Sequence, residues 1–138
     1  MCYNSWSNKA IGFIRGKRQG KMDNTESLKK NEQFREIYST GKSFANKYLI
    51  MYLKKNEFNY NRIGISVSKK VGNSVVRHRI TRLIRESYRL SEGSILSGLD
   101  IIVVARVGAK GKDYSEIKSA LLHLIKLHKV GKEGQINI

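Results

Sequence analysis

SVSKKVGNSVVRHRITRLIRESYR, residues 66–89, carries the clearest periodic signal in the chain. Its apolar residues recur at spacings of three and four and are Val76, Ile80, Leu83 and Ile84. That spacing places them on one face of an α-helix. Because Asn73 and Ser74 are both suitable N-caps, we predict a helix over residues 73–90 whose apolar face packs against a sheet.

The opposite face of this predicted helix is cationic. From Lys69 to Arg89 the chain has seven Lys or Arg residues and one acid. On a helical wheel the residues opposite the apolar stripe are His78, Arg82, Arg85 and Arg89, and those flanking it are Arg77 and Arg79. Like charges at helical spacing repel one another, so we interpret this face as an anion-binding surface. A merely solvated face is the alternative.

The expected anion is the phosphate of a nucleic acid. Lys69, Lys70 and Asn73 stand before the predicted helix start, where free backbone N–H groups and the helix dipole attract phosphate. Arginine guanidinium groups bind phosphate oxygens in pairs. The whole chain has 27 Lys+Arg against 11 Asp+Glu, a formal net charge of +16. Such a charge indicates a polyanionic partner.

Outward from this helix, the 138 residues are predicted to form one domain. The expected elements, in chain order, are a helix from Asn31 to Gly41, a strand over 44–54, a strand over 62–68, the basic helix, a fully buried strand over 101–105, and a helix from Asp113 to about Lys129 that Gly131 ends. Asp113 and Glu116 form a capping-box-like pair. We expect the first two strands to pair as a hairpin. The order α-β-β-α-β-α predicts a single α/β domain with helices packed on a small sheet.

The two ends of the chain are expected to lie outside this domain, which covers residues 28–130. Residues 1–27 form a basic N-terminal arm that we interpret as disordered, and a translation start at Met22 is the alternative. Residues 131–138 are expected to be a frayed tail. Cys2 is the only cysteine, which excludes a disulfide framework and fits a cytoplasmic protein. No apolar run is long enough to predict a membrane span.

The sequence offers no readable catalytic or metal centre. Its eleven acids form no local cluster of the kind that two-metal nucleases use. His123 and His128 are five residues apart, which misses the i,i+4 spacing of helical metal ligands. We therefore expect no metal site and no catalytic residue in this chain.

Aromatic residues predict a second binding surface. Phe34 and Tyr38 share a face of the first helix, and Phe44, Tyr48 and Tyr52 share a face of the first strand if its pairing is regular. Aromatic rings beside basic residues suit single-stranded nucleic acid, because bases stack on them without sequence preference. A core position is the alternative for each ring, and it is most evenly balanced for Phe34 and Phe44.

Five segments together resemble the protein subunit of bacterial ribonuclease P. They are LKKNEQF (28–34), GKSFAN (41–46), GISVSKKVGN (64–73), RHRITRLIRE (77–86) and DIIVVAR (100–106). The resemblance implies a two-layer sandwich like the second domain of ribosomal protein S5, with a left-handed βαβ crossover. It also implies that the chain, as one monomer per RNA, joins a catalytic RNA in removing the 5′ leader from precursor tRNA. In that family the RNA and its bound magnesium ions perform the hydrolysis, and the protein raises magnesium and substrate affinity.

The resemblance also assigns roles to residues. Those matching the surface that meets the RNA subunit are Lys69, Lys70, Asn73, Arg77, Arg79, Arg82, Arg85 and Arg89. Those matching the cleft that contacts the single-stranded leader are Lys30, Phe34, Tyr38, Tyr52 and Ser66. His78 and Thr81 depart from the family pattern, which usually has Asn and a basic residue there. Two other functions stay open at this point: a free-standing nuclease, and a structural protein that binds nucleic acid by charge alone.

Overall fold

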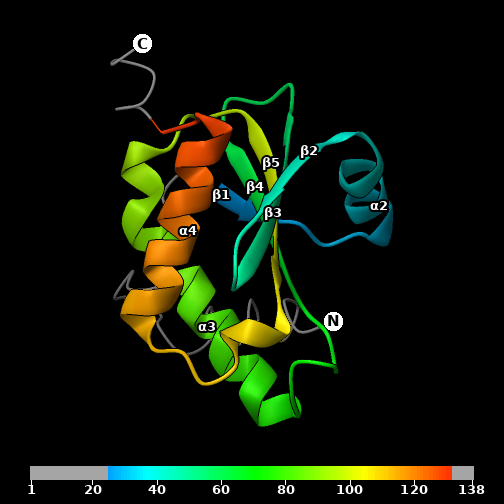
Figure 1. Cartoon of the computed structure of the whole chain (residues 1–138). Coiled ribbons are helices and arrows are strands. Elements are labelled where there is room, and N and C mark those ends of the chain that lie inside the picture. Colours follow the sequence, from blue (N-terminus) through cyan, green and yellow to red (C-terminus); the bar gives the residue numbers. More distant parts are fainter. Residues whose placement is uncertain (1–24, 132–138) are drawn as a thin grey trace, which may run out of the picture.

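One five-stranded sheet organises the computed structural model, which describes residues 25–131. The strands, in the spatial order β1-β4-β5-β3-β2, are β1 (Thr25–Ser27), β4 (Asn61–Val67), β5 (Leu99–Ala105), β3 (Leu49–Lys55) and β2 (Lys42–Ala45). The helices are α2 (Asn31–Thr40), α3 (Ser74–Ser91) and α4 (Tyr114–His128), with short 3-10 turns η1 (Glu92–Ser94) and η2 (Val107–Ala109). α3 and α4 lie against one face of the sheet, and α2 crosses the other face (Figure 1). The predicted α/β sandwich is confirmed. The order of elements has two more strands than predicted, because β1 was not expected and the strand predicted over 44–54 is two strands, β2 and β3.

The central strand is β5, as its unbroken apolar run predicts. It pairs in parallel with β4 and antiparallel with β3. Every residue of β5 is buried except Val104, which is half-buried. The predicted hairpin of the first two strands is therefore wrong, because β5 lies between β3 and β4. The local apolar pattern identifies a strand but does not indicate which distant strand pairs with it.

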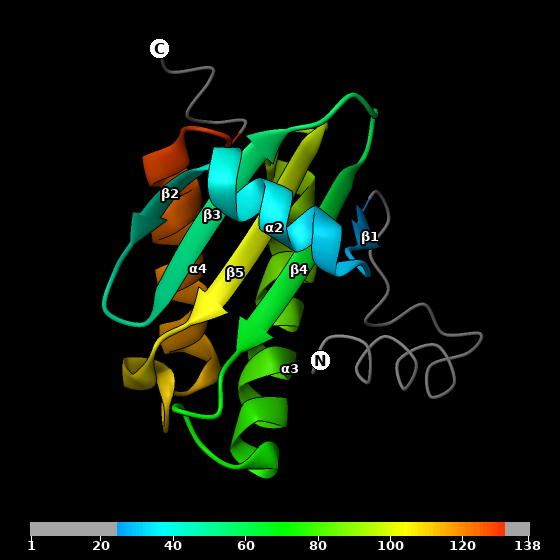
Figure 2. The same cartoon turned by 90° about the vertical axis from the view of Figure 1, so that its right-hand side faces the viewer.

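The chain from β4 through α3 to β5 forms the expected crossover. In Figure 2 the arrows of β4 and β5 both point downward, β4 lies to the right of β5, and α3 lies behind them. This is the left-handed arrangement, opposite to the usual rule for parallel strands. The crossover places the whole length of α3 along the outside of the molecule.

The strand predicted over residues 44–54 is two strands joined by a tight turn. Asn46 makes the turn, because its Oδ1 accepts the N–H groups of Tyr48 (3.1 Å) and Leu49 (3.0 Å). Phe44 therefore lies in β2 opposite Met51, on the face that α4 covers. There its ring meets the imidazole of His128 edge-on, with centroids 4.8 Å apart. The prediction that Phe44, Tyr48 and Tyr52 share one face is wrong.

β1 corrects the predicted boundary of the arm. Thr25–Ser27, which we had placed in the arm, pairs in parallel with β4 at the edge of the sheet. Its side chains also bind α3: Thr25 Oγ1 lies 2.9 Å from the hydroxyl of Tyr88, and Ser27 Oγ accepts from Arg85 Nη2 at 2.8 Å. The rest of the predicted arm, residues 1–24, and nearly all of the predicted tail, residues 132–138, lie outside the described residues.

Helix starts follow the sequence closely. Asn73 caps α3, accepting the N–H of Val76 at 3.0 Å. Asp113 and Glu116 form the predicted capping box of α4. The backbone N–H of Glu116 lowers the pKa of Asp113, because it stabilises the carboxylate.

One helix start and one helix stop differ from the prediction. The N-cap of α2 is Lys30 rather than Asn31, and Gly41 ends that helix as predicted. α4 extends to about Lys129 as predicted, but the residue that ends it is Lys129 itself, in the left-handed conformation (φ 59°), and not Gly131. Gly131 instead bridges to Ile95.

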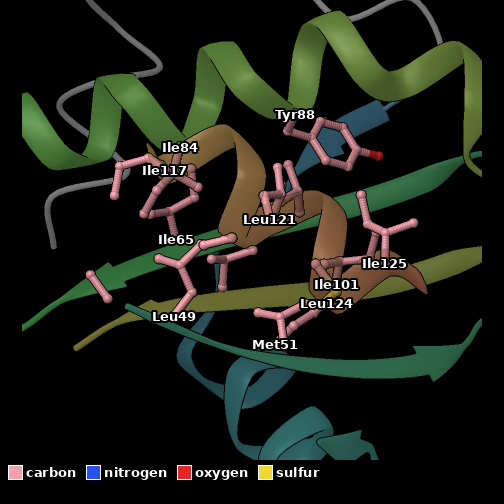
Figure 3. Packing of buried hydrophobic residues seen from close by; sticks show 14 of the residues in the cluster. Leu49, Met51, Ile65, Ile84, Tyr88, Ile101, Ile117, Leu121, Leu124 and Ile125 are labelled. Carbon is pink, nitrogen blue, oxygen red and sulfur yellow. The ribbon is translucent and has the colours of Figure 1, made fainter. Parts of the chain in front are cut away.

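Two apolar clusters hold the layers together. The larger one fills the space between the sheet and the helices α3 and α4 (Figure 3). The smaller one lies under α2 and consists of Leu28, Phe34, Ile37 and Ile102. Within residues 25–131, none of the helices combines the length and apolarity that crossing a bilayer requires.

Candidate nucleic-acid interface

The N-terminal half of α3 and the loop before it present cations to solvent. Lys69, Lys70, Arg79 and Arg82 are exposed. Arg77 is half-buried, because its Nη1 donates to the carbonyl of Gly72 at 3.0 Å. The apolar stripe on the other side of α3 anchors this half of the helix to the sheet, which fixes where these cations point. We call Lys69, Lys70, Arg77, Arg79 and Arg82 the α3 cations.

Asn73 lies among these cations and determines where the helix that carries three of them begins. Its side-chain oxygen caps the helix by accepting the N–H of Val76. The cap starts α3 four residues before Arg77. Asn73 thereby sets the position of the helical cations as well as being exposed itself.

Arg85 does not belong to the exposed surface, which corrects the helical wheel. Only 5% of it is exposed, because β1 packs over this side of α3. Burial lowers the pKa of Arg85 to about 10, since the guanidinium loses contact with water. Its hydrogen bond to Ser27 shows what covers it. The wheel failed because β1 had been assigned to the arm.

The C-terminal half of α3 is different from the cationic half. Arg89 is half-buried and binds Glu86, with Nη2 and Oε2 2.5 Å apart. Thr81 is buried and donates to the carbonyl of Arg77 at 2.9 Å. The predicted ridge along the whole helix is therefore interrupted after Arg82.

Two tyrosines and a serine form a second surface beside α2. The rings of Tyr38 on α2 and Tyr52 on β3 meet edge-on, with centroids 4.8 Å apart. Ser66 lies on the same face of the sheet. Tyr52 pairs with Ile102 and Ser66 pairs with Val104, and these two partners are two residues apart on β5, so their side chains share one face. Burial raises the pKa of Tyr38, and a hydrogen bond with Ser66 partly offsets this. We call Tyr38, Tyr52 and Ser66 the tyrosine surface.

Phe34 supports this surface from below. It is 4% exposed and belongs to the cluster under α2, so the core alternative holds for its ring. Its ring packs directly on the backbone of Gly64, where an added Cβ would lie 2.5 Å from Cζ. Lys30, at the start of α2, is exposed. Of the five residues matched to the leader cleft, four therefore reach solvent at least in part.

The side chains exposed on these two surfaces are of kinds that bind nucleic acid. Residues 25–131 contain no group of three His, Cys, Asp or Glu side chains that could hold a metal ion. Exposed guanidinium and ammonium groups can bind phosphates, and partly exposed tyrosine rings can stack on bases.

Sequence reasoning missed Lys47, Arg106 and Lys110, which come from two connections far apart in the chain but lie at the same end of the sheet as Lys69. No local pattern links them.

Comparison with known proteins gives one consistent family. A family model described as Ribonuclease P matches residues 22–129. The ribonuclease P protein component of Lachnoclostridium phytofermentans is 70% identical over 106 residues, covering 77% of this chain and 91% of the relative. The structure of the Staphylococcus aureus RNase P protein superposes with a TM-score of 0.72 at 43% identity, covering 76% of this chain and 96% of that one. A mutant of the Staphylococcus aureus protein with defective mRNA degradation activity gives a TM-score of 0.71 at 37% identity, covering 93% and 96%.

These matches span the sheet, the helices and both candidate surfaces. They agree with the α/β fold. The chain belongs to the bacterial ribonuclease P protein family, and is thus a subunit of a ribonucleoprotein endoribonuclease that acts in tRNA processing.

Proposed function

We propose that the α3 cations bind the catalytic RNA of ribonuclease P. One observation carries this: residues 69–85 contain six Lys or Arg and no acid, and all but Arg85 reach solvent at least in part. Each phosphate that such a cation neutralises releases condensed counterions, which favours binding at low salt. Asn73 contributes through the helix start that it fixes.

The tyrosine surface is proposed to contact the single-stranded 5′ leader of precursor tRNA. Tyr38 is 38% exposed and Tyr52 is half-buried, so each ring keeps a part that a base can reach. Ser66 adds a hydroxyl beside them. Lys30, at the start of α2, adds a positive charge, and the buried ring of Phe34 supports the surface from below. Stacking of this kind is worth roughly 1–3 kcal/mol per base and tolerates any sequence.

The hydrolysis itself is proposed to be carried out by the RNA and its bound magnesium ions. The protein's part is electrostatic. Its +16 charge reduces the repulsion between the RNA subunit and the incoming precursor, which raises substrate affinity. The phosphates of the two RNAs then lie closer together, and this raises the affinity of the complex for magnesium. One protein monomer per RNA, acting in the cytoplasm, completes the proposal.

Reconstitution tests the proposal directly. Precursor tRNA would be incubated at low magnesium with the protein alone, with the ribonuclease P RNA of Lachnoclostridium phytofermentans alone, and with both. We expect cleavage at the mature 5′ end only in the third reaction. Cleavage by the protein alone would contradict the division of roles, and that reaction also tests for the kind of RNA degradation attributed to the Staphylococcus aureus protein.

The stacking proposal has its own test. Tyr52→Leu keeps an apolar side chain against the cluster under α2 but removes the ring. The variant should weaken binding of leader-bearing precursor several-fold while leaving mature tRNA nearly unaffected. Phe58→Ala, which removes an exposed ring on the connection between β3 and β4, is the matched control. Equal losses for both RNAs would contradict the role of Tyr52.

A further inference from the structure

Three connections meet at one end of the sheet. β4 and β5 both end there, since Val67 pairs with Ala105, and β3 begins there, since Leu49 also pairs with Ala105. The connections are residues 46–48 before β3, 68–73 after β4, and 106–112 after β5. Residues 68–73 and 106–112 lie toward the lower end of the molecule in Figure 2, near the start of α3. Residues 46–48 lie beside 106–112, because Arg106 binds the carbonyls of Asn46 and Tyr48.

These connections carry positive charge only. Their Lys and Arg residues are Lys47, Lys69, Lys70, Arg106, Lys110 and Lys112, and they contain no Asp or Glu. Five of the six are exposed, and Lys112 is half-buried. The nearest acids along the chain, Asp113 and Glu116, cap α4, and Glu116 Oε2 also lies 4.0 Å from Lys112 Nζ.

Hydrogen bonds hold the connections to one another and to α3. Arg79 of α3 donates from Nη1 to the carbonyl of Lys112 at 2.9 Å. Arg106 donates from Nη1 to the carbonyl of Asn46 at 2.7 Å, and its backbone N–H donates to Tyr48 at 2.8 Å. The ammonium of Lys112 lies 5.3 Å from the centre of the Tyr48 ring. The positive charges are therefore carried on a surface that is ordered before any ligand arrives.

The opposite end of the sheet carries acids beside its cations. There Arg62 forms a two-pronged ion pair with Asp100, and Lys54 pairs with Glu36. The overall charge of +16 does not by itself produce such an asymmetry, because cations spread evenly would occur at both ends. The asymmetry points to a polyanion at one end.

We propose that Lys47, Arg106 and Lys110, which we call the basic end, bind phosphates of the ribonuclease P RNA beside the α3 cations. This inference rests on the proposed function and widens its interface from one helix to a surface that includes the ends of three strands. Arg79 joins the two parts, since it belongs to α3 and holds the connection that carries Lys110. Nothing in the basic helix alone would assign these three residues.

The test removes the three charges together. The triple variant Lys47→Ala/Arg106→Ala/Lys110→Ala would be compared with Lys42→Ala/Lys55→Ala/Lys126→Ala. The control removes the same charge from exposed lysines toward the other end of the molecule. Binding of the Lachnoclostridium phytofermentans ribonuclease P RNA would be measured from 50 to 200 mM salt.

We expect the slope of log affinity against log salt to flatten by about 2.7 in the basic-end variant, at about 0.9 per phosphate contact. Over this fourfold salt range the wild-type protein should then lose about 40-fold more affinity than the variant. The control should keep the wild-type slope. Circular dichroism and urea unfolding would establish that both variants are folded.

A third variant separates the two proposals. If Arg82→Ala flattens the slope by about one unit but the basic-end variant behaves like its control, the basic end is not an RNA contact and the α3 interface stands. Unchanged slopes in all three variants would overturn the α3 interface as well. If the basic-end variant proves unfolded, Lys47→Gln and Lys110→Gln, which remove charge but not side-chain length, repeat the test, and an unchanged slope in both overturns the inference.

Discussion

Gly64→Ala should push α2 away from the sheet. Gly64 is in the middle of β4, and the Phe34 ring packs on it where a side chain would normally stand. An added Cβ would lie 2.5 Å from Phe34 Cζ, 2.6 Å from Cε1 and 3.2 Å from Leu28 Cδ1. Carbon atoms in contact prefer about 3.5–4.0 Å, so the ring would have to move by about 1 Å or more. Because Phe34 is 4% exposed, it has little free space to move into.

The expected loss of stability is moderate. Overpacking a core typically destabilises by about 1–3 kcal/mol. Replacing glycine by alanine returns about 0.4–1 kcal/mol by restricting the unfolded chain. The net expectation for Gly64→Ala is therefore a decrease of about 1–2 kcal/mol in the free energy of unfolding.

A double-mutant cycle tests whether the Phe34 ring is the cause. Urea unfolding would be measured for Gly64→Ala, Phe34→Leu and the double variant. Leu at position 34 lacks the ring atoms that the new Cβ would meet, so Gly64→Ala should become neutral or slightly stabilising in that background. A coupling energy of about 1 kcal/mol or more is expected. The reasoning is refuted if Gly64→Ala lowers stability equally in both backgrounds.

Two further predictions concern buried ionisable groups. Arg85→Met should leave the salt slope of RNA binding unchanged, because the 5% exposed guanidinium cannot reach a phosphate; a slope lower by a full unit would show that Arg85 contacts RNA. The second prediction concerns His128, whose Nε2 lies 3.0 Å from the carbonyl oxygen of Met51. Burial lowers the pKa of its imidazole in the folded protein. As pH falls through about 6.5, the unfolded chain therefore takes up a proton at this side chain before the folded protein does. Stability should accordingly fall between pH 7 and pH 5, and His128→Gln should reduce that fall in urea unfolding; an identical pH dependence in the variant would contradict this.

Local sequence signals predicted what local interactions produce. The start of α3 at Asn73, the capping box at Asp113 and the buried character of β5 all follow from residues within a few positions of one another. The cationic half of α3 was also found, because the spacing places Arg82 opposite the apolar stripe and Arg79 at its flank, and both are exposed.

Contacts between distant segments were beyond that kind of reasoning. Arg85 was placed on the surface because nothing in the helix indicates that Ser27, 58 residues earlier, covers it. Phe44 and Tyr52 were placed on one face because the turn at Asn46 is made by a single side chain within an otherwise strand-like run. The basic end was missed for the same reason: its cations come together only when β3 and β5 pair.

The position of β5 has a consequence for how the molecule is made. Among residues 25–131, β5 is the last strand in sequence and yet the middle one in the sheet, so neither β3 nor β4 has its central partner until β5 has emerged. About 40 residues separate the end of β4 from the end of β5, which at typical rates of synthesis is about 2–8 s. Throughout that interval the apolar edges of β3 and β4 lack the strand that later lies between them. We therefore expect the nascent chain to assemble its sheet late and in one cooperative step, and to be most prone to mispairing in the seconds before residues 99–105 appear.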